Sequence, residues 1–104
     1  MPPNFPADVP IYPGARLTAG ASFASTGQVS WGMEWETIDS LNKVAAYYTR
    51  QFQQGDWTFK VDSSTATDFS TTVTRKSNSH FTGTLAADST SGVTKILLSL
   101  VSSG

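Results

Sequence analysis

The sequence contains no cysteine, which excludes disulfides, thiol catalysis and cysteine metal sites. Charged residues make up only 14% of its 104 residues, against about 25% in a typical soluble domain, and the formal net charge is −1. Because there is no basic field, we expect neither nucleic acid nor an anionic membrane surface as a partner. No apolar run approaches the ~18 residues of a membrane span, so we expect no membrane insertion of this domain.

The sequence also lacks the motifs that commonly carry chemistry. It has no glycine-rich phosphate loop and no GxSxG nucleophile elbow. The single histidine, His80, lies beside a predicted turn without an evident set of metal ligands, so we expect it to be solvated. Glu34 and Glu36 would lie ~7 Å apart on one strand face, within range of a glycosidase pair, but we favour ion pairing with Arg16 or Lys60. We therefore predict no catalytic residue, no metal ligand and no cofactor.

Proline is concentrated at one end of the chain. All five prolines fall within the first 13 residues, where they disfavour both helix and sheet interior. We expect residues 1–13 to form an extended lead over the surface, followed by a single domain over residues 14–104. Pro13-Gly14 predicts a turn into that domain. Met1 ahead of this lead predicts that an anchoring or targeting segment precedes it in the full-length protein, and an authentic cytosolic start is the alternative.

Alternating patterns predict strands. Apolar and polar residues alternate over residues 17–23 and 29–35 with a turn signal between them, which predicts a hairpin with one buried face. Four more strands are expected after residue 57. In the last of these, over residues 93–101, apolar side chains take both faces, with Ile96, Leu98 and Leu100 on one and Leu97 and Val101 on the other. Such a strand is central in its sheet, or its outer face is covered.

One amphipathic helix is predicted over residues 40–54. Its apolar stripe consists of Leu41, Val44, Ala45, Tyr48 and Phe52. Thr37, Asp39 or Ser40 would cap its start, and Gly55 stands where a left-handed C-terminal cap is expected. The predicted order is therefore ββαββββ, an α+β two-layer sandwich with the helix packed on an antiparallel sheet.

Large aromatic rings gather on the faces that helix and sheet would turn toward one another. We therefore predict a core that contains Trp31, Trp35, Tyr48, Phe52 and Trp57. Tyr47 lies one step, ~100°, from the helix stripe and is expected at its border or outside it. Together with Leu97 and Val101 on the second face of the last strand, Tyr47 forms our candidate interaction surface.

Four short segments resemble a recurrent bacterial pattern. They are YPGA at residues 12–15, TIDS at residues 37–40, VAAYY at residues 44–48 and GDW at residues 55–57. The pattern is typical of small bacterial domains of unknown function that are secreted or anchored as lipoproteins, and the resemblance covers residues 8–62. Asp56 is inserted between the usual Gly and Trp. The resemblance implies an α+β fold and an extracytoplasmic location, and it carries over no catalytic residue.

We expect a non-enzymatic extracytoplasmic domain, secreted or anchored to the bacterial cell envelope. Its expected role is protein interaction, with another protein or with itself. The alternative is a small apolar-ligand carrier that binds its ligand between helix and sheet, which requires a cavity of ~300 Å³ or more. The aromatic rings argue against that cavity because they would fill it. An enzyme would need polar groups converging in a pocket around Glu34 and Glu36.

Overall fold

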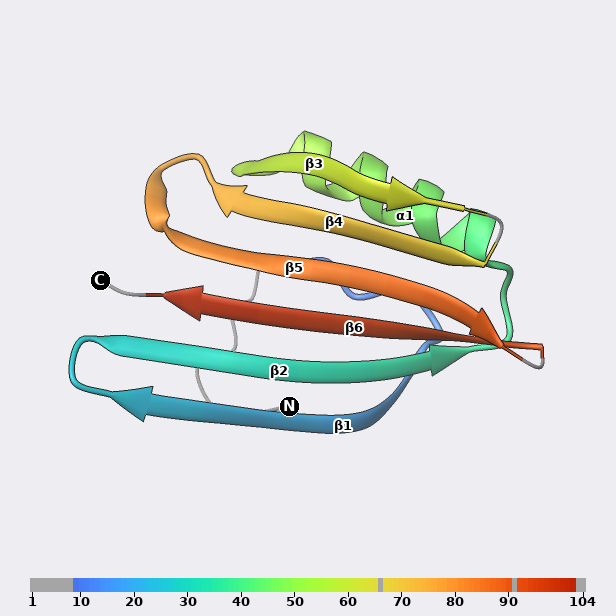
Figure 1. Cartoon of the computed structure of the whole chain (residues 1–104), viewed down its shortest axis with the longest axis horizontal. Helices are drawn as coiled ribbons and strands as arrows, with labels where there is room; N and C mark the ends of the chain where they lie inside the picture. The colour runs from blue at the N-terminus through green and yellow to red at the C-terminus, as the bar shows by residue number, and fades with distance from the viewer. Residues whose placement is uncertain (1–8, 66, 91, 103–104) are drawn as a thin grey trace.

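A six-stranded antiparallel sheet and one α-helix make up the fold in the computed structural model, which describes residues 9–65, 67–90 and 92–102 (Figure 1). The chain follows the predicted order ββαββββ and has the predicted α+β architecture. The elements are β1 (Arg16–Ser25), β2 (Gln28–Thr37), α1 (Leu41–Gln54), β3 (Trp57–Ser64), β4 (Asp68–Arg75), β5 (Asn78–Thr90) and β6 (Val93–Ser102).

The sheet has the strand order β1-β2-β6-β5-β4-β3, so β1 and β3 are its edges. Strand β6 lies between β2 and β5, which confirms the central position predicted from its two apolar faces. In Figure 1 the helix and the described N-terminal segment both lie behind the sheet. We call the face toward the helix the inner face and the opposite face the outer face.

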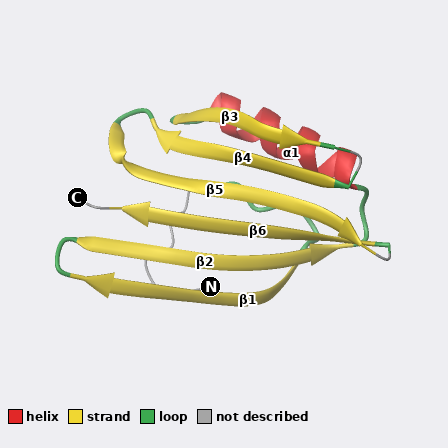
Figure 2. Cartoon of the chain, in the orientation of Figure 1, coloured by secondary structure: helices red, strands yellow, loops and turns green. Residues whose placement is uncertain are grey.

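Helix α1 packs along β3, β4 and β5 on the inner face (Figure 2). Ser40 is its N-cap, with a side-chain oxygen that accepts a hydrogen bond from the backbone N–H of Lys43 at 3.4 Å. The buried positions of the helix are Leu41, Val44, Tyr48 and Phe52. Because these residues recur at helical spacing, a single stripe faces the sheet, as predicted.

The end of the helix differs from the prediction. Gly55 has φ −99° and ψ −168°, an extended conformation, so the expected left-handed cap is wrong. A side chain at Gly55 would bring its Cβ to 3.1 Å from Cδ1 of Trp57. Glycine is therefore favoured here because the Trp57 ring approaches the backbone closely as the chain turns into β3.

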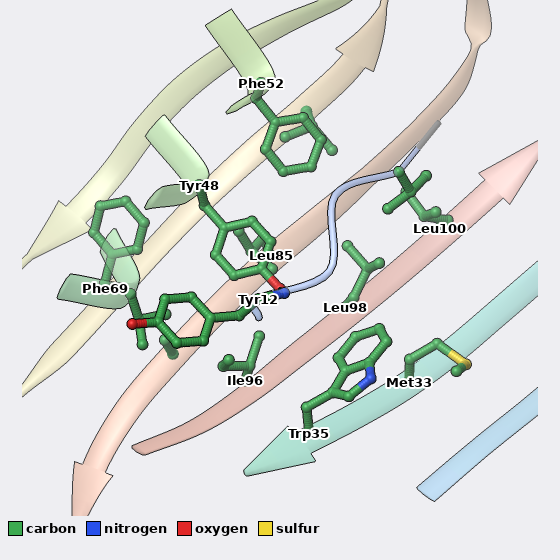
Figure 3. Close-up of a cluster of buried hydrophobic side chains, with 14 of the residues drawn as sticks. Tyr12, Met33, Trp35, Tyr48, Phe52, Phe69, Leu85, Ile96, Leu98 and Leu100 are labelled. Carbon is green, nitrogen blue, oxygen red and sulfur yellow. The ribbon is translucent and has the colours of Figure 1, made fainter. Parts of the chain in front are cut away.

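Aromatic rings dominate the core on the inner face (Figure 3). Phe52 is fully buried, and its ring centroid lies 5.6 Å from that of Trp57 and 5.5 Å from that of Phe59. The predicted core residues Trp31, Trp35, Tyr48, Phe52 and Trp57 are all buried, at 5%, 2%, 1%, 0% and 2% exposure. Burial of each large ring contributes about 2–3 kcal/mol, so this layer is the main source of stability.

The end of the proline-rich lead packs into the core. Val9 and Tyr12 are 4% and 8% exposed and belong to the buried cluster. Figure 3 shows Tyr12 beside Tyr48 on the inner face. Val9 and Tyr12 therefore turn their side chains into the core and cover sheet area that the helix leaves open, whereas Ile11 and Pro13 remain exposed as a surface course requires. Residues 1–8 lie outside the described part of the chain.

The turn predicted at the end of the lead is present. Gly14 has φ +78°, in the left-handed region that favours glycine. The backbone N–H of Ala15 donates to the carbonyl oxygen of Tyr12 at 3.1 Å and closes the turn. The turn directs the chain from the inner face into edge strand β1.

We expect Gly83→Ala to destabilise the protein by about 1–3 kcal/mol, because the new methyl group would overpack a close strand contact. The Cβ would overlap the backbone oxygen of Ser99 on β6 and lie 2.6 Å from Cδ2 of Leu100. Gly32→Ala is the matched control, since nothing lies within 4 Å of its Cβ, and it should change stability by less than about 0.5 kcal/mol. Urea unfolding of both variants measures the difference, and equal midpoints would contradict the close contact at Gly83.

Candidate functional site

The outer face of the sheet is open, since none of the described elements covers it (Figure 1). Its side chains form rows across the central strands. In one row Glu34 on β2 lies opposite Leu97 on β6, and Leu97 lies opposite Ala86 on β5. In the next row, Ser99 lies between Gly32 and Thr84. Most of these side chains are short, so they leave room above the strands.

A hollow of about 390 Å³ lies above these rows. The side chains and backbone around it belong to residues of four strands, among them Ala19, Gly32, Glu34, Thr84, Ala86 and Leu97. A smaller hollow of about 130 Å³ shares Ala86 and Leu97 with it and extends toward Ser70 on β4. The volume of the larger hollow is within the ~300–1,000 Å³ typical of small-molecule sites, and its lining is mostly apolar.

Glu34 is the charged residue among those that line the hollow, and Glu36 lies two residues further along β2. Glu34 accepts a hydrogen bond from the hydroxyl of Thr18 on β1 at 2.6 Å. Glu36 pairs with Arg16 at 3.2 Å, which confirms one of the two cationic partners that we predicted. Because the Arg16 side chain is 80% exposed, this pair adds little to stability. The two glutamates therefore have separate partners.

The three residues of the predicted interaction surface do not form one patch. Leu97 is 45% exposed and stands on the outer face at the centre of the sheet. Val101 is half-buried on the same face, four residues further along β6. Tyr47 belongs to α1, on the other side of the sheet, and is half-buried. The structure places Leu97 and Val101 on the same face of β6 and separates both from Tyr47.

Tyr47 belongs to a cluster of three tyrosines that fastens the lead to the helix. Its hydroxyl donates to the backbone oxygen of Ile11 at 3.0 Å. Its ring lies at 5.2 Å, edge to face, from the rings of both Tyr12 and Tyr48. The Tyr12 hydroxyl donates to Oδ2 of Asp39 at 2.6 Å, and the Tyr12 backbone N–H donates to the Tyr48 hydroxyl at 3.1 Å. Tyr47 therefore makes a contact within its own chain.

The tyrosine hydroxyls are held in their protonated form. The hydrogen bond to Asp39, with burial as a second cause, raises the pKa of Tyr12 to about 12. Burial raises the pKa of Tyr48 and of Tyr47 as well. Each hydroxyl is therefore neutral at physiological pH. Those of Tyr12 and Tyr47 donate hydrogen bonds, and that of Tyr48 accepts one from the Tyr12 backbone N–H.

A second hollow, of about 360 Å³, lies between the lead and the helix. Its lining includes Tyr12, Asp39, Lys43, Tyr47 and Arg50. This lining is charged and hydroxyl-rich, in contrast with that of the outer face. This second hollow lies along the contact between the lead and α1.

His80 is exposed on β5, away from the hollow of the outer face. Within residues 9–65, 67–90 and 92–102, His, Asp and Glu form no group of three or more that could hold a metal ion. Within the described part of the chain, α1 falls short of the length and apolar character that a membrane-spanning helix needs.

The periodic pattern of the sequence did not predict the outer hollow, because alanine and glycine form part of its lining. We expected one buried face for the whole first hairpin, and this is right for β2 and wrong for β1, which is exposed along its length. Ala19 and Ala21 alternate like core residues, yet they face outward. The available signal was the lack of any large side chain at Ala19, Ala21 and Gly32, which are too small to fill a core layer.

Comparisons with known proteins give one finding. A family model described as START domain-like matches residues 17–96, from the beginning of β1 into β6. No curated protein and no solved structure matches the chain.

We expect Tyr12→Phe to lower the free energy of unfolding by about 1–2 kcal/mol at neutral pH, because it removes the hydrogen bond to Asp39. The pKa of Tyr12 is higher in the folded protein than in the unfolded chain. The contribution of its hydroxyl is therefore complete below pH 10 and is lost as the pH rises toward about 12. Unfolding of both proteins between neutral pH and that limit tests this. A difference that stays constant over this range would contradict the assigned contact.

Proposed function

Because the chain belongs to the START domain-like family, we propose that it is a non-enzymatic domain that binds a small apolar molecule. The observation that carries the proposal is the apolar hollow of about 390 Å³ on the outer face. START domains bind hydrophobic ligands, which supports an apolar ligand for this chain. The proposed ligand lies over Leu97, between Gly32 on β2 and Ala86 on β5.

The position of the site differs from the carrier that we considered from the sequence. The space between helix and sheet is occupied by Tyr48, Phe52 and Trp57, each at most 2% exposed. A ligand at that position would have to displace rings whose burial contributes about 2–3 kcal/mol each. The outer hollow requires no such displacement, so it is the favoured site.

The lining favours one class of apolar molecule. Leu97 and Ala86 offer apolar contact, while Thr84 and Glu34 place polar groups at the rim. A carboxylate is an acceptor with several lone pairs, and Thr18 occupies only part of the capacity of Glu34. A ligand with a hydroxyl or amine at one end would therefore bind better than a fatty acid, whose carboxylate Glu34 would repel.

Protein interaction is the second candidate function. Its supporting observation is Phe23 on β1, which is 72% exposed and is the kind of residue that anchors protein interfaces.

We retain an extracytoplasmic location as part of the proposal, because residues 8–62 resemble secreted and lipoprotein-anchored domains. Recovery of the full-length protein from the cytosolic fraction of its own cells would overturn that location.

Filling the hollow tests the proposed ligand site. We expect the wild-type protein to bind the apolar dye N-phenyl-1-naphthylamine with an increase in its fluorescence. Gly32→Leu should weaken this binding about tenfold or more, because the new side chain enters the hollow, which is open above Gly32.

Thr58→Leu is the matched control for this variant. It adds a leucine to the same exposed face on β3, outside the hollow, and should leave dye binding unchanged. Circular dichroism of both variants checks that they are folded. Equal dye affinity in wild type and Gly32→Leu would show that the dye binds elsewhere and would contradict the proposed site.

A further inference from the structure

The two edges of the sheet are protected to different degrees. Edge strand β3 carries Lys60 and Asp62 and has an irregular register between Val61 and Ser63. Such charges and bulges prevent an edge from pairing with another strand. Edge strand β1 pairs regularly with β2 over Ala19–Ser25 and has no charge or proline in that stretch. It is exposed along its length, so its free edge is available for pairing.

We propose that two copies of the chain pair antiparallel through β1 to form a twofold dimer with a continuous twelve-stranded sheet. Centring the twofold axis on Ser22 pairs every residue of Ala19–Ser25 with one in the partner. Ser22 then lies opposite its own copy, and Phe23 lies opposite the partner's Ala21. No charges oppose one another in this stretch, and its only large side chain is set against alanine.

The pairing would bring a ring from each chain to the hollow of the other. Ala21 lies opposite Gly32 of β2 on the outer face, and Gly32 lines the hollow. Directly opposed side chains have Cβ atoms ~4.5–5.5 Å apart, so the partner's Phe23 would lie over Ala21. Nothing lies within 4 Å of a Cβ at Gly32, which leaves space for the edge of that ring.

The ligand site is therefore completed by the second chain, an inference that rests on the proposed function. In one chain the hollow is open on its outer side, whereas small-molecule sites commonly bury ~70–90% of the ligand surface. The partner's Phe23 supplies an aromatic wall along the β1 side. In the dimer, the 72% exposed ring of each chain gains an apolar contact that the single chain does not provide.

The geometry favours a second copy over a strand from another protein. The stretch Ala19–Ser25 is compatible with itself in antiparallel register, and the net charge of −1 causes little repulsion between copies. Helix α1 packs over β3, β4 and β5, so it does not obstruct β1. An isologous contact uses both β1 edges at once, and the protected β3 edges stop further growth, so assembly ends at the dimer.

Charge substitutions at the twofold axis test the pairing by sedimentation velocity over a range of concentrations. We expect a wild-type dimer, and we expect Ser22→Lys and Ser22→Glu each to weaken it by about tenfold or more, because like charges lie directly opposite. An equimolar mixture of the two variants should recover the dimer, because the charges then attract. Thr58→Lys, on the other edge, is the matched control and should remain dimeric.

Three results would overturn the pairing. They are a wild-type monomer at its highest soluble concentration, a dimer that survives Ser22→Lys, and a mixture of Ser22→Lys and Ser22→Glu that stays monomeric. A wild-type chain that is monomeric and pairs only with a strand of another protein would likewise reject the second copy as occupant.

Dye titration separates the pairing from the ligand site. Ser22 is absent from the lining of the hollow, yet Ser22→Lys should lower the affinity for N-phenyl-1-naphthylamine relative to Thr58→Lys, because the partner's Phe23 is lost. Phe23→Ser should lower it as well. Unchanged affinity in both would reject Phe23 as part of the site, even if the dimer is present. A dimer that binds no dye would reject the proposed function and leave the pairing supported.

Discussion

Burial of the α1 aromatic stripe against the sheet is the constraint on which the rest of the structure depends. Phe52 and Tyr48 are at most 1% exposed, and Phe52 packs against Trp57 from the strand that follows the helix. This packing fixes which face of the sheet is the inner one. Since each strand alternates sides, the choice also decides which residues face outward.

The inner face is wider than one helix, and the lead covers part of the remainder. Tyr12 reaches Tyr48 through its backbone and Asp39 through its hydroxyl, which places Val9 and Tyr12 in the core. With the inner face filled in this way by the described residues, the apolar hollow of about 390 Å³ lies on the outer face. A carrier function is therefore compatible with an aromatic core, because the two use opposite faces of one sheet.

The elements that produce a strong periodic signal were predictable from the sequence. The helix stripe of α1 predicted the face that packs on the sheet, and the two apolar faces of β6 predicted its central position. The second face of β6 is nevertheless open, with Leu97 45% exposed. The backbone conformation of single residues was harder to predict from the sequence. Gly55 fits a left-handed cap by position, yet the approach of Trp57 gives it an extended conformation.

The candidate site was less predictable than the fold. Leu97 was identified because it is a large apolar residue on the second face of β6. The hollow around it was not, because alanine and glycine produce the same alternation whether they face a core or a solvent-exposed hollow. The role of Tyr47 depends on its contact with Ile11, 36 positions away in the chain, which sequence periodicity does not reveal.

Methyl NMR provides the most direct test of which face binds. Leu97 faces the hollow, whereas its chain neighbour Ile96 is fully buried on the inner face. We predict that titration with N-phenyl-1-naphthylamine shifts the Leu97 methyl resonances and leaves those of Ile96 nearly unchanged. Large shifts at Ile96 with none at Leu97 would place the ligand between helix and sheet and contradict an inner face closed by its aromatic rings.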